Sequence, residues 1–449
     1  MSKLRYAGAG PSMGPARVVR GAGALALAMS LAISPVPAWA RTAQSFKSAQ
    51  AEVAAWQRYH GPQTLWVDNG QLRPEAQQLI ELVRSARIDG LDPDAYRVRN
   101  LEGAVRGAFG GNPKDLAKAD FLLSQTLVAV SRDMRNVRGN EMKFADRAAY
   151  PTLPSAGLLL DAAAKAPSLS AWLDAMPWMS PAYVALRQAV RAQADPRQAQ
   201  VLRVNLERAR ALPGALQGGR YVLVDAAAAR LYMIENGEVK DMMRVVVGRP
   251  DNPTPMLAGI IRYAILNPYW NVPPDLAATR LAPHVVSDGL SYLTKAHYEV
   301  LSDWGDNPKR LNPKTIDWQA VAAGRMPDLR MRQLPGPDNS MGRIKFMFPN
   351  DMGIYLHDTD DKSLFAEPAR MRSGGCIRLQ AANRLAKWLF GKQPTTASKK
   401  PEQKVPVPTP VPVYVTYLTA APENGQIAFR DDIYHRDGGA RLLAQTAAR

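Results

Sequence analysis

One histidine and the single cysteine of the chain lie near each other in the sequence, between Gly353 and Arg378. His357 ends the run Gly353-Ile-Tyr-Leu-His357, and Cys376 follows Ser373 and two glycines. A thiol attacks as its thiolate, which is scarce at neutral pH for an unperturbed cysteine, so efficient attack needs a nearby base. Imidazole has the matching pKa. The pair therefore predicts an acyl-transfer site with Cys376 as the nucleophile and His357 as the general base.

Gly374 and Gly375 stand directly before the cysteine. Glycines allow a tight turn that exposes the sulfur and points consecutive N–H groups outward, so we expect the N–H groups of Gly375 and Cys376 to form an oxyanion hole. The alternatives are a chance pairing with His357, or a cysteine that is only a small buried hydrophobe. A metal site is a weak rival, because one cysteine and five histidines show no usual ligand spacing. We expect neither a metal nor a cofactor.

The segment around Cys376 resembles the L,D-transpeptidase family, whose members carry a histidine, about fifteen residues, and then Ser/Thr-x-Gly-Cys-aliphatic-Arg. The matching residues are His357, Ser373, Gly375, Cys376, Ile377 and Arg378. Further similar stretches are 245–250 with Thr254-Pro255, 267–273, 333–342, 345–350 and 355–359, while 88–96 and 205–208 are similar to the helical scaffold domain of the large periplasmic members. The chain departs from the family at Gly374, where a second histidine is common, and it shows no segment like the small peptidoglycan-binding repeat domain of some members.

The resemblance implies a reaction on peptidoglycan stem peptides, which would be both donor and acceptor. Cys376 would attack the carbonyl of the third residue of a tetrapeptide stem, at its bond to the terminal D-alanine. An amine of a neighbouring stem would then open the thioester to give a 3–3 cross-link. Carbapenem-type β-lactams are the covalent inhibitors that the resemblance implies. Tyr355, Ser373, Gly374 and Arg378 would support the site or bind substrate, with plain packing as the alternative for Tyr355 and Arg378.

Two other functions stay open at this stage. The same thioester could tether an envelope protein to the wall or be hydrolysed, and the motif does not separate these outcomes. A catalytically inert wall-binding scaffold is the non-enzyme alternative, which only Gly374 supports. A papain-like protease is disfavoured by chain order, because His357 precedes the cysteine.

The strands and the helix that would position His357 and Cys376 come after a first half of the chain that is predicted to be helical. Residues 41–215 are predicted to form a helical scaffold domain, with helices from Pro74 to Gly90 and over 115–136, 183–194 and 196–211. From Arg220 short β-rich runs begin, and Asn236-Gly237 predicts a hairpin. The predicted strands are 221–224, 230–234, 239–247, 260–266, 344–348, 353–357, 411–418 and 426–429, with a helix over 382–389 that ends at Gly391.

The expected fold class is α+β, with a mainly β, mixed-sheet and sandwich-like catalytic domain over 216–437. Residues 273–340 break the β pattern and are too long for a connection, so we interpret them as an inserted lid or subdomain, which closes over the site or forms a rigid cap. Residues 392–410, rich in Lys, Pro and Thr, are expected to be a mobile surface loop, and 438–449 a C-terminal tail.

The first forty residues have the layout of a secretory signal peptide. Lys3, Arg5, Arg17 and Arg20 precede an apolar run, and small residues around Ala40 suit cleavage; an uncleaved anchor is the alternative. Cleavage would lower the formal charge of +17 by four and leave no membrane span. The mature chain is therefore expected to be basic and periplasmic, in an anionic envelope. Nucleic acid is not expected as a partner, because the basic residues are scattered and match no binding motif.

Overall fold

The computed structural model describes residues 38–60, 65–137, 141–395 and 400–440. All but the last three residues of the predicted signal peptide, and most of the predicted tail, lie outside the described residues. Within the described ranges, no helix is both long enough and apolar enough to cross a membrane.

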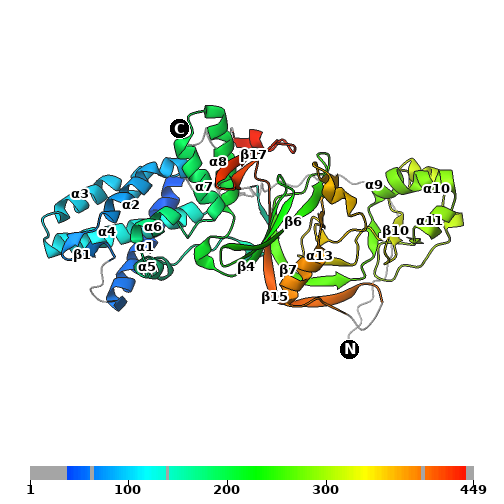
Figure 1. Ribbon diagram of the computed structural model, residues 1–449, viewed down its shortest axis with the longest axis horizontal. Helices are drawn as coiled ribbons and strands as arrows, with labels where there is room; N and C mark the ends of the chain where they lie inside the picture. The colour runs from blue at the N-terminus through cyan, green and yellow to red at the C-terminus, as the bar shows by residue number, and fades with distance from the viewer. Residues whose placement is uncertain (1–37, 61–64, 138–140, 396–399, 441–449) are drawn as a thin grey trace, which may run out of the picture. The chain divides into compact units, whose positions relative to one another are not determined.

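The first half of the described chain is helical, as predicted (Figure 1). Its longer helices start where the sequence supplies caps: Asn112 accepts a hydrogen bond from Lys114 N before α4, and Asp195 accepts from Arg197 N before α8. The helices are α1 Ala38–His60, α2 Glu75–Arg84, α3 Val98–Ala108, α4 Pro113–Arg135, α5 Ala156–Ala164, α6 Leu169–Ala175, α7 Pro181–Ala192 and α8 Pro196–Arg210. Three short strands accompany them, β1 Val67–Asp68, β2 Gln71–Leu72 and β3 Lys143–Phe144.

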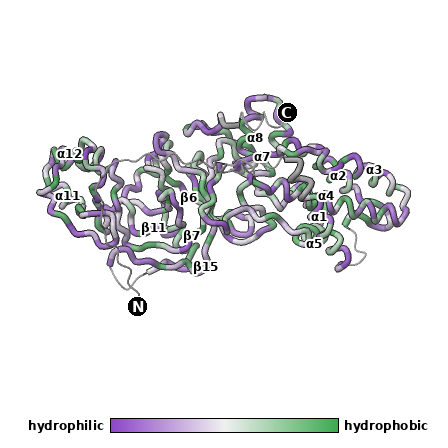
Figure 2. The backbone as a smooth tube through the Cα atoms, turned by 180° about the vertical axis from the view of Figure 1, so that it is seen from behind, coloured by the Kyte–Doolittle hydropathy of each residue, from purple (hydrophilic) through white to green (hydrophobic). Residues whose placement is uncertain are grey.

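The second half is built on one mixed sheet, whose described strands follow the order β11-β12-β14-β6-β5-β4-β15-β7-β3, with β13 on β6. The helical first half followed by a mixed sheet confirms the expected α+β fold class, and because β11 pairs with both β12 and β7, the sheet closes on itself. Figure 2 shows the hydrophobic stretch of β7 within this sheet. The strands are β4 Arg220–Asp225, β5 Arg230–Glu235, β6 Glu238–Gly248, β7 Leu257–Leu266, β11 Ile344–Met347, β12 Leu356–His357, β13 Met371–Ser373, β14 Ile377–Leu379 and β15 Gln403–Thr416.

The predicted hairpin and the late helix are both confirmed. Asn236 and Gly237 join β5 to β6 with φ angles of 53° and 82°, the left-handed conformation that these residue types tolerate. Helix α13, Ala382–Phe390, buries its apolar stripe and ends at Gly391 with φ of 75°. A separate hairpin, β16 Ala420–Glu423 with β17 Gln426–Phe429, follows the sheet.

The insertion after β7 forms a subdomain with its own hydrophobic core. Trp270, Val272, Trp318 and Met331 are among the buried residues of that core. Its strands pair in the order β8-β10-β9, and its bounds begin slightly before the predicted 273. Its elements are β8 Trp270–Val272, α9 Pro274–Leu276, a π-helix Ala277–Leu281, α10 Ala282–Asp288, α11 Ser291–Lys295, β9 Tyr298–Leu301, α12 Trp318–Ala322 and β10 Arg330–Gln333. Movement of this subdomain as a lid stays a prediction.

The loop predicted over 392–410 is wrong from Gln403 onward, because β15 begins there. Four prolines between 406 and 412 suggested a break in regular structure. In the structure the early part of β15 pairs with β7 alone, and β4 joins only from Val413. A strand with one open edge tolerates residues that lack an N–H, and the register shift between Pro406 and Val411 absorbs the irregularity.

Candidate active site

The predicted histidine and cysteine come together through two neighbouring parallel strands. β12 pairs with β14 so that His357 lies opposite Arg378, and Ile377 N donates to Tyr355 O at 3.1 Å. Side chains alternate along a strand, which puts Tyr355 and His357 on one face. Their rings meet edge to face with centroids 5.7 Å apart. Cys376 comes directly before β14, across from Tyr355. The fold thus gathers four of the predicted site residues at one sheet position.

The turn that carries Cys376 is fixed by two buried hydroxyls. Gly375 has φ of 110°, a conformation that side chains rarely adopt. Ser373 Oγ donates to Cys376 O at 2.6 Å and accepts from Gly375 N at 3.1 Å. Thr254 Oγ1 donates to Gly375 O at 2.8 Å and accepts from Gly248 N at the end of β6. Ser373 therefore holds the turn, and its described contacts do not include His357.

The predicted oxyanion hole needs a correction at Gly375. Its N–H donates to Ser373 Oγ, so in this conformation it does not point freely toward a substrate. The N–H groups of Gly374 and Cys376 have no acceptor among the described residues. These two are the better candidates for donors to an oxyanion.

His357 is buried, with 2% of its surface exposed. Its Nδ1 lies 2.5 Å from the carbonyl oxygen of Asp358, and a carbonyl can only accept, so Nδ1 carries the hydrogen. Nε2 is then left with a free lone pair, as a general base requires. Burial, followed by the charge of Arg378, lowers the pKa of His357 to about 3, against the opposing effect of Asp358. The imidazole is neutral at physiological pH.

The Cys376 thiol is partly buried and donates to Gly353 O at 3.5 Å. Burial raises the pKa of the thiol, while the backbone N–H and hydroxyl of Tyr355 and the charge of Arg378 act against the rise. Cys376 and His357 both lie in the described part of the chain. In this conformation no hydrogen bond joins the thiol of Cys376 to the imidazole of His357. Hydrogen bonds of this kind are often long before substrate binds.

Two supporting residues link the site to the inserted subdomain. Tyr355 packs against the subdomain core, and burial, with Cys376 nearby, raises the pKa of its hydroxyl. Burial lowers the pKa of Arg378, and the negative charge of Asp360 opposes this decrease. The positive charge of Arg280, on the π-helix of the subdomain, lowers the pKa of Arg378 further. Arg378 Nε is buried with no hydrogen-bond partner in the described structure. The site therefore presents guanidinium groups from both the sheet and the subdomain.

Sequence reasoning missed the roles of Thr254, Gly353 and Arg280. Thr254 was noted only as part of a family-like turn, and a hydroxyl that bridges two distant backbone segments leaves no local pattern. At Gly374, where the family commonly has histidine, an added Cβ would meet only Asn252 Nδ2 at 3.8 Å, so this position has room for a side chain. Within the described residues, no group of three or more His, Cys, Asp and Glu side chains could hold a metal ion.

Comparison with known proteins finds two domain families along the chain. Residues 219–413 match the YkuD family, described as the L,D-transpeptidase catalytic domain, and residues 51–190 match a family described as the scaffold domain. A Haemophilus influenzae protein named "Putative L,D-transpeptidase" is 31% identical over 245 residues, which are 53% of this chain and 48% of that protein. The chain thus spans about half the length of this curated relative.

Two solved structures are also similar. One is an L,D-transpeptidase from Mycobacterium smegmatis, at 14% identity and a TM-score of 0.23, covering 44% of this chain and 58% of that chain. The other is described as the "Ldtfm-avibactam carbamoyl enzyme", at 15% identity and a TM-score of 0.22, covering 44% of this chain and 49% of that chain.

Proposed function

The chain belongs to the L,D-transpeptidase family, and from this premise we propose that it transfers acyl groups between peptidoglycan stem peptides through a thioester on Cys376. The observation that carries the proposal is the β12–β14 pairing: a neutral imidazole ends β12, and the thiol directly precedes β14, at the end of a glycine turn. His357 and Cys376 are the groups that we assign to the chemistry. The helical part, residues 41–215, would be the scaffold domain.

In the acylation step, Cys376 Sγ attacks the carbonyl carbon of the third stem residue while its proton passes to His357 Nε2. The tetrahedral intermediate collapses, the bond to the terminal D-alanine breaks, and the imidazolium returns the proton to the leaving amine. Because the pKa of His357 is held low, the imidazole accepts the proton only while negative charge develops beside it.

In the second step, a side-chain amine of a neighbouring stem attacks the thioester and gives a 3–3 cross-link, releasing the thiol. The N–H groups of Gly374 and Cys376 would hold the oxyanion in both steps. Arg378 and Arg280 supply positive charge that suits the terminal carboxylate of the donor. The inserted subdomain would exclude water, which competes with the amine for the thioester. The site of action would be the periplasm, after removal of residues 1–40.

Intact-mass spectrometry of the purified mature protein with a tetrapeptide stem tests this proposal. We expect one mass increase, equal to the stem without its D-alanine, which disappears when a second stem is added and a cross-linked product forms. Cys376→Ala is expected to abolish the increase. A carbapenem should acylate the protein once, at the same residue. No acylation of a folded protein by either reagent would contradict the proposal.

The same experiment separates the other uses of a thioester. Loss of the acyl group without a cross-linked product would indicate hydrolysis, and transfer only to an added envelope protein would indicate tethering. Either result would replace cross-linking while leaving Cys376 as the nucleophile.

A further inference from the structure

The segment 430–437, called the strap here, follows β17 and contacts the turn that holds the catalytic loop. Tyr434 Oη donates to Gly248 O at 2.7 Å, and Arg436 Nη1 donates to Thr254 O at 3.3 Å. The N–H of Gly248 donates to the Thr254 hydroxyl, and this hydroxyl donates in turn to Gly375 O. The strap is therefore two hydrogen bonds away from the glycine turn.

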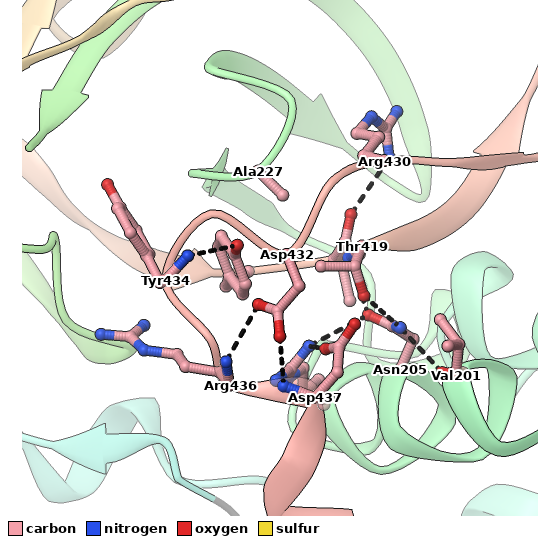
Figure 3. Close-up of polar contacts among 12 residues, drawn as sticks. Val201, Asn205, Ala227, Thr419, Arg430, Asp432, Tyr434, Arg436 and Asp437 are labelled. Carbon is pink, nitrogen blue, oxygen red and sulfur yellow. Dashed lines mark hydrogen bonds and ion pairs between the residues drawn. The ribbon is translucent and has the colours of Figure 1, made fainter. Parts of the chain in front are cut away.

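Hydrogen bonds to the Asp432 carboxylate and the stacking of Tyr434 on Tyr417 hold the strap in its conformation. Asp432 accepts from Arg436 N at 2.9 Å and from Asp437 N at 2.7 Å, as Figure 3 shows. The rings of Tyr434 and Tyr417 stack with centroids 4.8 Å apart, and Tyr434 N donates to the Tyr417 hydroxyl. These contacts fix where the Tyr434 hydroxyl and the Arg436 guanidinium point.

The other end of the strap is attached to helix α8 of the helical region. Arg208, which is 3% exposed, pairs with Asp437 at 2.7 Å and lies over the Tyr417 ring. Asn205 Nδ2 donates to Thr419 Oγ1 at 2.7 Å and its Oδ1 accepts from Thr419 N (Figure 3). These contacts, made by the buried side chains of Arg208 and Asn205, join the end of the strap and the segment before it to α8.

We propose that Tyr434 and Arg436 are positioning residues for the thiol, which hold the Gly248–Thr254 turn against Gly375 while α8 anchors the strap. This inference rests on the proposed function, and it deepens it by naming how the helical region reaches the site. The route is Arg208 to Asp437, then through the strap to Thr254 and on to the turn that presents Cys376. Arg436 also lines a hollow of about 330 Å³ with Pro253, Pro255 and Met352.

The sharpest variant is Tyr434→Phe, which removes the hydrogen bond to Gly248 O and keeps the ring on Tyr417. Its matched control is Tyr414→Phe, because the Tyr414 hydroxyl also donates to a backbone carbonyl, Ala149 O at 3.0 Å, away from the turn. Each variant loses one hydrogen bond from a tyrosine hydroxyl to a backbone carbonyl, part-buried for Tyr434 and buried for Tyr414, so the control should lose at least as much thermal stability.

Two rates distinguish positioning from simple stabilisation. We expect Tyr434→Phe to slow acylation by a carbapenem about fivefold and Thr254→Val about tenfold or more, because a misplaced nucleophile loses its attack geometry. Alkylation of Cys376 by iodoacetamide, the chain's single thiol, should instead become faster at neutral pH. A loosened turn lets water reach the sulfur, and less burial lowers the pKa of the thiol.

Asp437→Asn weakens the anchor on α8 and should change both rates in the same directions, more weakly than Tyr434→Phe. If Tyr434→Phe and Tyr414→Phe give the same alkylation pH profile, the strap does not position the thiol and the inference fails. If wild type is alkylated normally but neither a carbapenem nor a stem peptide acylates it, the proposed function fails, while the alkylation comparison still tests the strap.

Discussion

Two buried polar clusters in this protein differ in how their charges are balanced. In the helical region, the Asp89 carboxylate accepts from the Tyr183 hydroxyl at 2.7 Å and from Arg187 Nε at 2.9 Å, while Arg210 donates to Asp89 O at 2.8 Å. At the site, His357 is buried beside the charge of Arg378, and Arg378 Nε has no described partner.

The difference indicates two purposes. A buried charge with matched hydrogen bonds specifies a packing arrangement, and it is costly only when one partner is removed. The His357 imidazole is kept neutral by burial, with the charge of Arg378 adding to this effect, so it has no matched charge partner. Burial perturbs pKa values in both clusters, raising those of Asp89 and Tyr183 and lowering that of His357, but only the second cluster contains a nucleophile. Breaking the first cluster should damage folding, whereas breaking the second should damage acylation, and the following predictions test that division.

The largest effect is expected from His357→Gln. Glutamine keeps a buried polar side chain but cannot accept the thiol proton, so acylation by a carbapenem should slow by about 10²- to 10⁴-fold, the usual contribution of a general base. Stopped-flow or mass-spectrometric acylation rates measure this. A loss below threefold would assign the base to another group.

Asp89→Ala should destabilise the fold by about 3–5 kcal/mol, because it leaves the buried Arg187 guanidinium and the buried Tyr183 hydroxyl without their carboxylate acceptor. Denaturant unfolding measures this change. The acylation rate per folded molecule should match that of wild type within about twofold. A variant of normal stability and impaired acylation would reverse the roles of the two clusters.

The His357 imidazole also makes the fold sensitive to acid. Its pKa is about 3 in the fold and 6.5 when unperturbed, so the unfolded state binds more protons between these values. Stability is therefore fully present above about pH 6.5 and is lost as the pH falls toward about 3, by at most about 1.4 kcal/mol per pH unit from this group. Unfolding free energies of wild type and His357→Gln across that range should converge as the pH falls; a constant difference would contradict the buried, neutral histidine.

The smallest of these effects is expected from Arg378→Gln. The charge of Arg378 lowers the pKa of the Cys376 thiol, so its removal should raise that pKa and shift the alkylation profile to higher pH. At pH 7 alkylation by iodoacetamide should therefore become slower, because a smaller fraction of the thiol is ionised. An unchanged profile, or one shifted to lower pH, would show that the charge of Arg378 does not lower the pKa of the thiol.

The sequence predicted the features that local patterns encode. Capped apolar stripes indicated α4, α8 and α13, and Asn236-Gly237 indicated the β5–β6 hairpin. The residues around His357 and Cys376 resemble the L,D-transpeptidase family, and the comparisons confirmed this resemblance by matching the catalytic and scaffold domain families. The proline-rich start of β15 was mistaken for a loop, because a sequence does not reveal that one edge of a strand will stay open.

By itself the sequence determined which residue types could react and which segments would be helix or strand, since propensity, capping and glycine conformation act within a few residues. Only the tertiary structure decided that Ser373 occupies the N–H of Gly375, that Thr254 bridges two backbone segments, and that the sheet closes through β11 and β7. These features join residues that are 78 positions apart (Leu266 and Ile344) or 121 apart (Thr254 and Gly375), or they depend on the competition of one N–H for two acceptors. Distance and competition of that kind exist only after the chain has folded.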